Sequence, residues 1–505
     1  MSALSEYLGS TPADKISSEF VSMIASLETV SKVNPVVARA IVNELDNQRS
    51  HLKLIASENY CSLATQQAMG NWLTDKYAEG ISGGRFYQGC QNVDAVESEA
   101  AAQACKLFGA PYAYVQPHSG ADANMVAYWA ILQSRVCVPS LEELGVKVPD
   151  ALTDEQWEVV RHKLGDQRLL GLSLAAGGHL THGYRQNVSG KMFHAFNYGV
   201  SEKDHRLDYD AIEKMAEEIK PLVIVGGYSA YPRKVDFKRM RAIADKVGAV
   251  LMVDMSHFAG LVAGKVFTGD YSPFPHAHIV TTTTHKTLRG PRGGVIFAND
   301  PELAKSIDKG CPLVLGGPLP HVMAAKAVAF TEANTPAFAE YARKVVENSA
   351  ALAEACVKEG MTLITGGIDN HLFLVDVVSS FDLSGRQAAD ALEECGITLN
   401  KNGIPFDKLS PMVTSGLRIG TPAVTSLGMG KAEMAEIGSI IATVLRATKR
   451  GTIPEGKKNA GQPSNVEYSL DPEVRKSASA RVKALLGKFV LYPQMDLDFL
   501  RRHFC

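Results

Sequence analysis

Strongly apolar runs that alternate with amphipathic stretches are the feature that most limits how this chain can fold. Four such runs follow one another between residues 221 and 299: PLVIVGG, AVLMVDM, HIVTTTT and GGVIFAN. Each has the length of one buried strand. Between the first two lies DFKRMRAIADKVG, whose apolar residues recur at helical spacing. Apolar strands separated by helices predict a mainly parallel sheet covered on both faces, so the expected fold class is α/β.

The rest of the chain is predicted to form three parts around this sheet. Residues 1–60 are polar and helix-like, and predict an N-terminal helical arm that covers another subunit or belongs to the main body. Residues 61–335 are expected to form a large domain, and residues 336–505 a smaller α+β domain. Within the latter, the Gly-, Pro-, Lys- and Asn-rich segment 448–472 predicts an irregular connection, and the tail after it looks helical.

The composition makes several classes of protein improbable. Of 505 residues, 46% are hydrophobic and 21% charged, with a formal net charge of -2, so nothing favours nucleic acid or a membrane surface as partner. The eight cysteines are scattered without a CxxC pair, which indicates no metal site and fits a reducing compartment. We find no secretory signal, and no apolar run of the roughly 20 residues that a membrane helix needs. A cytoplasmic protein without a metal is expected.

The segment TTTTHKTLRGPRGG, residues 281–294, carries the strongest chemical signal. Lys286 follows a β-rich run, and ligands of open α/β sheets bind beyond the carboxyl ends of the strands. A lysine amine can condense with an aldehyde if neighbours or desolvation lower its pKa. The adjacent threonines and histidine supply hydrogen-bond donors, and the glycines let backbone approach a phosphate closely. A solvated surface lysine is the ordinary alternative.

Two further segments place polar residues at the ends of strand-like runs. Asp254 follows an apolar strand in VDMSHFAG, where it could pair with a protonated pyridine nitrogen or cap a helix that starts near Met255. In VQPHSGADAN, Ser119 and Gly120 look like a helix start that could bind phosphate, although a simple turn would explain them too.

Three more segments hold candidates whose ordinary alternatives stay open. His179 in AAGGHLTHG follows two glycines that suggest close approach to a flat group, or it is only a loop histidine. Arg418 lies inside an apolar run and needs an anion, either a substrate carboxylate or an internal acid. Glu79, in a glycine-rich loop with Tyr77 and Tyr87, could exchange protons with a substrate hydroxyl or be a solvated loop residue.

Together these segments resemble the serine hydroxymethyltransferase family of fold-type I pyridoxal-phosphate enzymes. The matching motifs occur in the family's order over about residues 50–430: LIASENY, KYAEG, VQPHSGADAN, GGHLTHG, GGYSAYPR, VDMSHFAG, TTTTHKTLRGPRGG, NKN and SGLRIGTPA. The combination of TTTTHKT with GPRGG is the most specific. The resemblance implies a seven-stranded-type, mainly parallel sheet in the large domain and a smaller C-terminal α+β domain.

The resemblance also implies a role for each matched residue. Lys286 would carry pyridoxal phosphate as a Schiff base, Asp254 would keep the pyridine nitrogen protonated, and His179 would stack on the ring. Near the ring oxygen would lie Ser229 and His257. The phosphate would be held by Ser119, Gly120 and His285, with Tyr77 and Gly294 contributed by the partner subunit. Arg418 would bind the amino-acid carboxylate, with Ser57 beside it. Asn402 would help to hold folate. Glu79 and Tyr87 of the partner subunit would serve the substrate hydroxyl and proton transfer.

The activity implied is reversible transfer of the serine hydroxymethyl carbon to tetrahydrofolate, which gives glycine and 5,10-methylenetetrahydrofolate. An obligate homodimer with sites across the interface is implied, and it could pair further into a tetramer. Aldol cleavage of other β-hydroxy amino acids, transamination and racemisation are conceivable side reactions. The alternatives are another pyridoxal-phosphate enzyme of this fold, such as a threonine aldolase or aminotransferase, and a non-catalytic binding protein.

The chain departs from the family's pattern in four places. The connection at 134–170 is lengthened and predicts a helical surface excursion, which could alter the folate mouth. Tyr184, Arg289 and Phe406 stand where the family usually has a serine, a small residue and a polar residue, respectively. These differences bear on folate affinity and substrate range rather than on the lysine chemistry.

Overall fold

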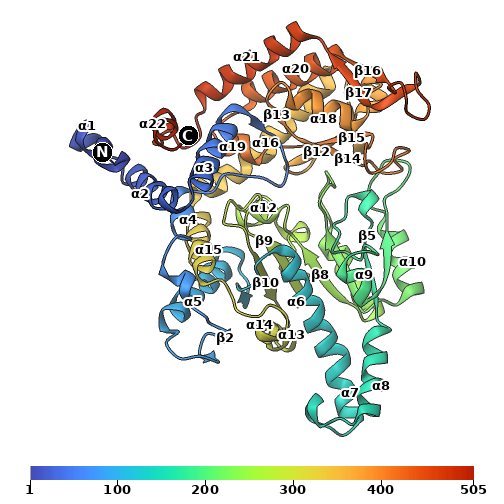
Figure 1. Ribbon diagram of the computed structural model, residues 1–505. Helices are drawn as coiled ribbons and strands as arrows, with labels where there is room; N and C mark the ends of the chain where they lie inside the picture. The colour runs from blue at the N-terminus through green and yellow to red at the C-terminus, as the bar shows by residue number, and fades with distance from the viewer. Residues whose placement is uncertain (1) are drawn as a thin grey trace.

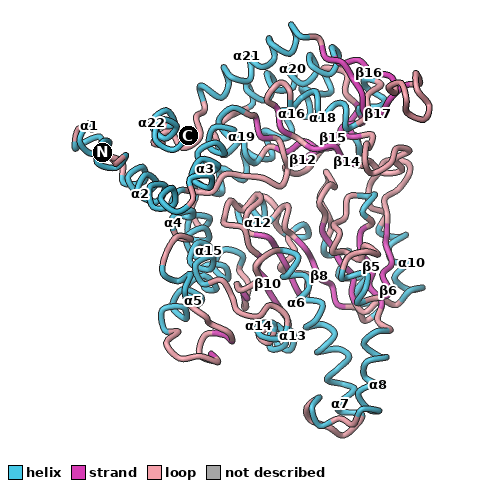
Figure 2. The backbone as a smooth tube through the Cα atoms, in the orientation of Figure 1, coloured by secondary structure: helices cyan, strands magenta, loops and turns pink. Residues whose placement is uncertain are grey.

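A seven-stranded sheet lies in the middle of the computed structural model, which describes residues 2–505 (Figures 1 and 2). From β9 across to β6 the strands are parallel, whereas β10 is antiparallel to both of its neighbours. The mainly parallel α/β sheet expected from the apolar runs is confirmed. In spatial order its strands are β4 (Ala113–Tyr114), β10 (Gly294–Ala298), β9 (Ile279–Thr283), β8 (Val250–Asp254), β7 (Val223–Gly227), β5 (Arg168–Leu172) and β6 (His194–Tyr198).

Alternating side chains of the same strands enter two separate cores. Ile224 and Leu251 pack on one face of the sheet, against helices α5 (Gln91–Phe108), α10 (Tyr209–Ile219), α11 (Phe237–Val247) and α15 (Pro320–Ala333). Val225 and Met252 point to the other face, against α6 (Gly120–Leu132) and α13 (Pro301–Ile307). Because both faces are covered, the strands read as continuous apolar runs rather than as alternating ones.

A smaller antiparallel sheet with its own core follows in the chain. Its order is β11-β12-β15-β14, with bounds Thr362–Leu363, Leu372–Asp376, Gly416–Gly420 and Asn400–Asn402. It is covered by α18 (Gly385–Glu393), α20 (Lys431–Ala447) and α21 (Pro472–Lys488). The long helix α16 (Pro336–Lys358) contributes Val345 to the large core and Leu352 to the small one. The domain limits at 60 and 335 remain a proposal, with α16 as the element that joins the two bodies.

The N-terminal arm consists of α1 (Ala3–Ser10), α2 (Ser18–Val33) and α3 (Pro35–Ser50), and it packs against the C-terminal helix α22 (Leu497–Phe504) (Figure 1). The rings of Tyr7, Phe20 and Phe499 form an edge-on cluster between the two ends of the chain. After the arm, β1 (Leu52–Lys53) pairs in parallel with β13 (Ile397–Thr398) of the smaller body. Among the described residues no helix is both long and apolar enough to span a bilayer.

Two connections differ from what the sequence suggested. The segment expected to be irregular forms a hairpin of β16 (Thr448–Thr452) and β17 (Pro463–Leu470), and only its tip is irregular. The excursion is helical as predicted, with α7 (Val138–Glu143) and α8 (Asp154–Gly165), but it projects from the side of the sheet opposite to the smaller body (Figure 1). The excursion leaves from the far end of α6 and returns at the amino end of β5. Ligands of such sheets bind at the opposite, carboxyl ends of the strands. The predicted effect of the excursion on the folate mouth of its own subunit is therefore wrong.

Candidate active site

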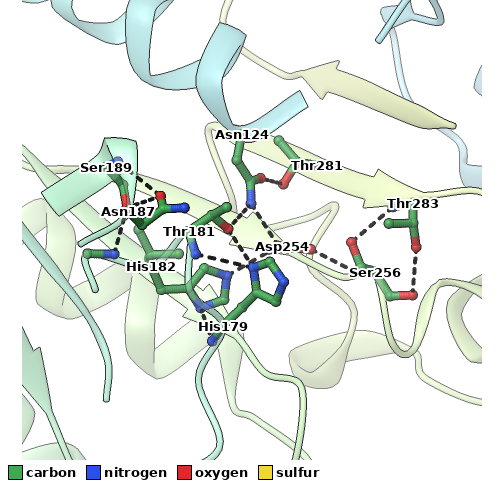
Figure 3. A network of polar contacts seen from close by, with 12 residues as sticks. Asn124, His179, Thr181, His182, Asn187, Ser189, Asp254, Ser256, Thr281 and Thr283 are labelled. Atoms are coloured by element: carbon green, nitrogen blue, oxygen red, sulfur yellow. Dashed lines mark hydrogen bonds and ion pairs between the residues drawn. The ribbon is translucent and has the colours of Figure 1, made fainter. Parts of the chain in front are cut away.

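A buried carboxylate at the carboxyl end of β8 is the centre of a polar network (Figure 3). Asp254 Oδ2 accepts hydrogen bonds from Asn124 Nδ2 at 2.9 Å and from His182 Nε2 at 3.2 Å. Its Oδ1 accepts from the Ser256 backbone N–H at 3.0 Å, in a turn rather than as a helix cap. Burial alone would raise the pKa of Asp254, but the hydrogen bond from His182 and the neighbouring histidines outweigh it, so the pKa lies below its usual value. The carboxylate therefore stays ionised.

Thr181 connects this network to the predicted ring-stacking histidine. It accepts from Asn124 Nδ2 at 2.8 Å and lies 2.8 Å from His179 Nδ1. Burial lowers the pKa of His179 to about 4, with the charge of His182 acting in the same direction, so His179 is neutral at pH 7. His179, His182 and Asp254 each offer one metal-ligand atom within 4.8 Å of the others. The same atoms are used in the hydrogen-bond network, which accounts for their closeness without an ion.

Lys286 lies in the turn directly after β9, between charged groups of both bodies. Its pKa is lowered to about 8, mainly by burial; Asp254 opposes the shift, and the charges of Arg418 and Arg292 add to it. The Asn59 side chain donates to the Lys286 carbonyl at 3.0 Å, which fixes the turn. A half-buried amine with a lowered pKa is unlike the solvated lysine that was the alternative.

Arg418 on β15 reaches from the smaller body to the large sheet. Its Nε donates to Asn400 Oδ1 at 3.0 Å and its Nη1 to the Ser229 carbonyl at 2.8 Å. Within residues 2–505 no Asp or Glu forms an ion pair with it, so the internal acid considered as an alternative is wrong. Burial lowers its pKa to about 10, which leaves it charged. A buried cation without an acidic partner is suited to binding an anion.

Next to the lysine turn, α6 begins with the Ser119 side chain as its N-cap, so the predicted helix start is confirmed. A Cβ on Gly120 would lie 2.5 Å from Thr283 Cγ2, so only glycine lets the helix terminus come this close to β9. Beside it, His285 Nδ1 is buried and has no hydrogen-bond partner among the described residues. Burial, with Arg292 and Lys286, lowers the pKa of His285 to about 3. A helix N-terminus and an unpaired ring nitrogen are both groups that can bind a phosphate oxygen.

A second buried histidine pair lies where the two bodies meet. His257 Nδ1 is 3.3 Å from His371 Nε2, and the rings are stacked with centroids 5.5 Å apart. Burial lowers the pKa of both, in His371 to about 3. His371, like Asn124 and His182, was not anticipated as a site residue. His182 follows the predicted His179 by three positions, and this spacing was the only signal for it in the sequence.

The loop with Tyr77, Glu79 and Tyr87 is not brought to Lys286 of its own chain. The rings of Tyr77 and Tyr87 meet edge-on at 5.2 Å, and Gly317 lies against the Tyr77 ring. This is compatible with their predicted use by a partner subunit. Gly294 is different: it is buried, and its N–H donates to the Pro117 carbonyl at 2.9 Å. The expected contribution of Gly294 to a partner's site is therefore wrong, because the residue is enclosed in its own subunit.

The remaining predicted residues lie around Arg418. Ser229 supplies the carbonyl that Arg418 binds, and Asn402 is two positions from Asn400 on β14. Ser57 follows Ala56, whose Cα lies 2.4 Å from where a Cβ on Gly420 would be.

The three residues that depart from the expected sequence pattern, Arg289, Phe406 and Tyr184, have different surroundings. Arg289 places its guanidinium 4.4 Å from the centre of the Tyr341 ring, so packing beneath the lysine turn accommodates it. Phe406 is exposed at a positive φ of 61°, with its ring 5.9 Å from that of His205. Tyr184 is partly exposed and lies in a turn after His182.

Comparison with known proteins gives consistent matches along the chain. A family model described as serine hydroxymethyltransferase matches residues 30–145 and 160–441, and the gap between the two parts falls in the helical excursion. A serine hydroxymethyltransferase of Treponema pallidum (strain Nichols) is 58% identical over 503 residues, which are 100% of this chain and 86% of that protein. The protein of that name from Salinispora tropica is 55% identical over 473 residues, 94% of this chain and 98% of the relative. One from Chlamydia trachomatis serovar D is 49% identical over 482 residues, 95% of each chain.

Proposed function

Because this chain belongs to the serine hydroxymethyltransferase family, we propose that the site around Lys286 transfers the hydroxymethyl carbon of serine reversibly to tetrahydrofolate. The products are glycine and 5,10-methylenetetrahydrofolate, and the enzyme is a pyridoxal-phosphate-dependent transferase of one-carbon metabolism. The observation that carries the assignment is the position of Lys286: a half-buried lysine with a lowered pKa, between ionised Asp254 and an Arg418 without an acidic partner.

The donors present fit pyridoxal phosphate. Ser119, Gly120 and His285 would hold its phosphate, with the unpaired His285 Nδ1 as the supporting observation. The bound cofactor supplies an aldehyde for Lys286 and a ring that accepts electrons when a bond at the substrate Cα breaks. Asp254 would hold a proton on the pyridine nitrogen, and the donors from Asn124 and His182 keep that carboxylate ionised and oriented.

The other residues would bind and orient the substrates. Arg418 would bind the amino-acid carboxylate in bidentate fashion, with Ser57 beside it. His179 would stack on the ring in its neutral form, and His257 and Ser229 would face the ring oxygen. Asn402 would contact folate from the smaller body. The same groups would allow slower cleavage of other β-hydroxy amino acids without folate.

We infer a homodimer in which Tyr77, Glu79 and Tyr87 serve the partner's site, with Glu79 and Tyr87 moving protons at the substrate hydroxyl. Exposed aromatics around this loop support the inference, since Trp72 is 90% and Phe86 67% exposed in the single chain. Pairing of two such dimers into a tetramer is a further proposal, which the same surface does not require. A cytoplasmic location is also proposed, because none of the eight cysteines is in a disulfide.

The test is reduction of the purified protein with borohydride, followed by peptide mapping. A pyridoxyl group fixed on Lys286 and absent from Lys286→Ala is expected, together with serine-to-glycine conversion that depends on tetrahydrofolate. Turnover of threonine-like substrates with no folate dependence would indicate an aldolase instead. Absence of any pyridoxyl peptide would remove the cofactor from the proposal.

A further inference from the structure

A fully buried lysine lies beneath the helix terminus assigned to the phosphate. Lys326 on α15 is 1% exposed, and its Nζ donates to the carbonyls of Val115, Pro117 and Gly294 at 2.6, 2.9 and 2.9 Å. An ammonium has three N–H donors, and here each meets one carbonyl oxygen. Burial lowers the pKa of Lys326 to about 7, while the charges of Glu97 and Asp122 oppose that shift. A buried cation without a salt bridge is costly, so its presence needs a reason other than packing.

The three carbonyls belong to two segments that border the phosphate position. Val115 and Pro117 lead from β4 into the N-cap Ser119 of α6, and Gly294 begins β10 after the lysine turn. The two segments also touch directly, since a Cβ on Gly294 would lie 2.3 Å from the Ser119 carbonyl oxygen. One ammonium therefore fixes the distance between the helix terminus and the strand that follows Lys286.

The same segment continues toward the loop that carries Glu79. Gln116, between the two carbonyls bound by Lys326, donates from Nε2 to the Gly80 carbonyl at 2.8 Å and to Glu97 Oε1 at 2.9 Å. Arg85 of that loop also binds Glu97. The backbone that Lys326 holds is thus attached on its other side to the loop proposed to serve the partner's site.

We propose that Lys326 is a positioning residue for the phosphate end of the cofactor site, acting through the backbone of residues 115–119 and Gly294 without touching the cofactor. The inference rests on the proposed function, because the phosphate is that of pyridoxal phosphate. Without the ammonium, all three carbonyls lose a donor, Pro117 keeps only the one from the Gly294 N–H, and the two segments are held together less firmly. Affinity for the phosphate group should then fall, whereas the aldehyde reaction at Lys286 should remain.

The experiment compares cofactor-free full-length protein as wild type, Lys326→Met and the control Lys265→Met. Lys265 donates to a single carbonyl, that of Leu107 at 2.8 Å, and borders neither segment. For each protein the affinities for pyridoxal 5'-phosphate and for unphosphorylated pyridoxal are measured by absorbance, well below the thermal midpoint. The preference for the phosphorylated aldehyde should fall roughly tenfold or more in Lys326→Met and stay unchanged in the control.

Gly293→Ala provides a second route if Lys326→Met does not fold. Its added Cβ would lie 2.5 Å from Lys326 Cε, so it displaces the ammonium without removing the charge, and the same loss of preference is expected. An unchanged preference in the variants that fold, or an equal loss of affinity for both aldehydes, overturns the role of Lys326. If wild type itself shows no preference, the phosphate assignment in the proposed function has failed instead.

Discussion

Asp254 remains charged in a buried position because three donors converge on it. Asp254→Asn keeps the size of the side chain but removes the charge that would pair with a protonated pyridine nitrogen. Removing one partner of a buried charge pair costs roughly 2–5 kcal/mol, so we expect kcat for serine with tetrahydrofolate to fall about 30-fold or more. Borohydride should still fix a pyridoxyl group on Lys286. Wild-type turnover in the loaded variant would contradict the role given to Asp254.

Lys286 has a lowered pKa of about 8, caused first by burial and then by Arg418 and Arg292. Only the neutral amine attacks an aldehyde, and the neutral fraction increases as pH rises through the pKa. In cofactor-free protein, the rate of pyridoxal phosphate attachment should rise with pH and level off above about 8. Stopped-flow absorbance checks this, with Arg418→Gln expected to move the midpoint upward because a positive charge is lost. A rate still rising near pH 10 would indicate an ordinary lysine.

The site residues that could be predicted are those whose own stretch of sequence has a recognisable pattern. Residues that join the site from other parts of the chain, without such a pattern, were missed. Lys286, Asp254 and Arg418 each follow or interrupt an apolar strand, and such a position is visible in the chain itself. Asn124 and His371 are identified as site residues only by the structure, in which Asn124 contacts Asp254 and His371 contacts His257. The error at Gly294 has the same origin, because its bond to Pro117 depends on the pairing of β10 beside β4.

At the scale of elements, the excursion of α7 and α8 has a small core of its own formed by Cys137, Leu141 and Val160. Val160→Ala should therefore weaken packing there by about 1–3 kcal/mol without disturbing the distant site. We expect faster proteolytic cleavage within residues 138–165 and an unchanged affinity for pyridoxal phosphate. Val225→Ala in the sheet core is the matched control and should lower the stability of the whole protein. Loss of cofactor affinity in Val160→Ala would mean that the excursion communicates with the site.

Elements with a buried face were predictable, whereas those without one were not. The strands β7, β8, β9 and β10 are buried at every position, and their apolar runs marked them clearly. The hairpin of β16 and β17 is buried only at Thr448 and Ser464 and is otherwise half-buried or exposed, and its Lys, Gly and Asn residues carry no strand periodicity. It forms because Thr448 and Leu470 pair at its base beside the smaller core, a tertiary contact that overrides weak local preference.

At the scale of the whole molecule, the exposed aromatics near the Glu79 loop predict a subunit interface. Trp72→Asp would place a charge in that interface, so we expect the protein to sediment as a monomer or to dimerise only at higher concentration. Trp157→Asp on α8 is the control, since that ring is also partly exposed but lies on the excursion. A Trp72→Asp protein that stays dimeric at low concentration would place the interface elsewhere.

The sharing of sites between subunits can be tested by mixing two inactive variants. In a hybrid of Lys286→Ala and Glu79→Gln subunits, the intact Lys286 would be served by the intact Glu79 of the other chain, if Glu79 acts across the interface. Random exchange makes half of the dimers hybrids with one complete site each, so about a quarter of wild-type activity should return. If Glu79 acts within its own chain, no site in the hybrid is complete and mixing restores nothing. Among residues 2–505 of one chain, no hydrogen bond or ion pair joins the Glu79 loop to Lys286, so we expect recovery. A mixture of Lys286→Ala and Asp254→Asn subunits is the control, and its activity should not exceed the residual rate of Asp254→Asn.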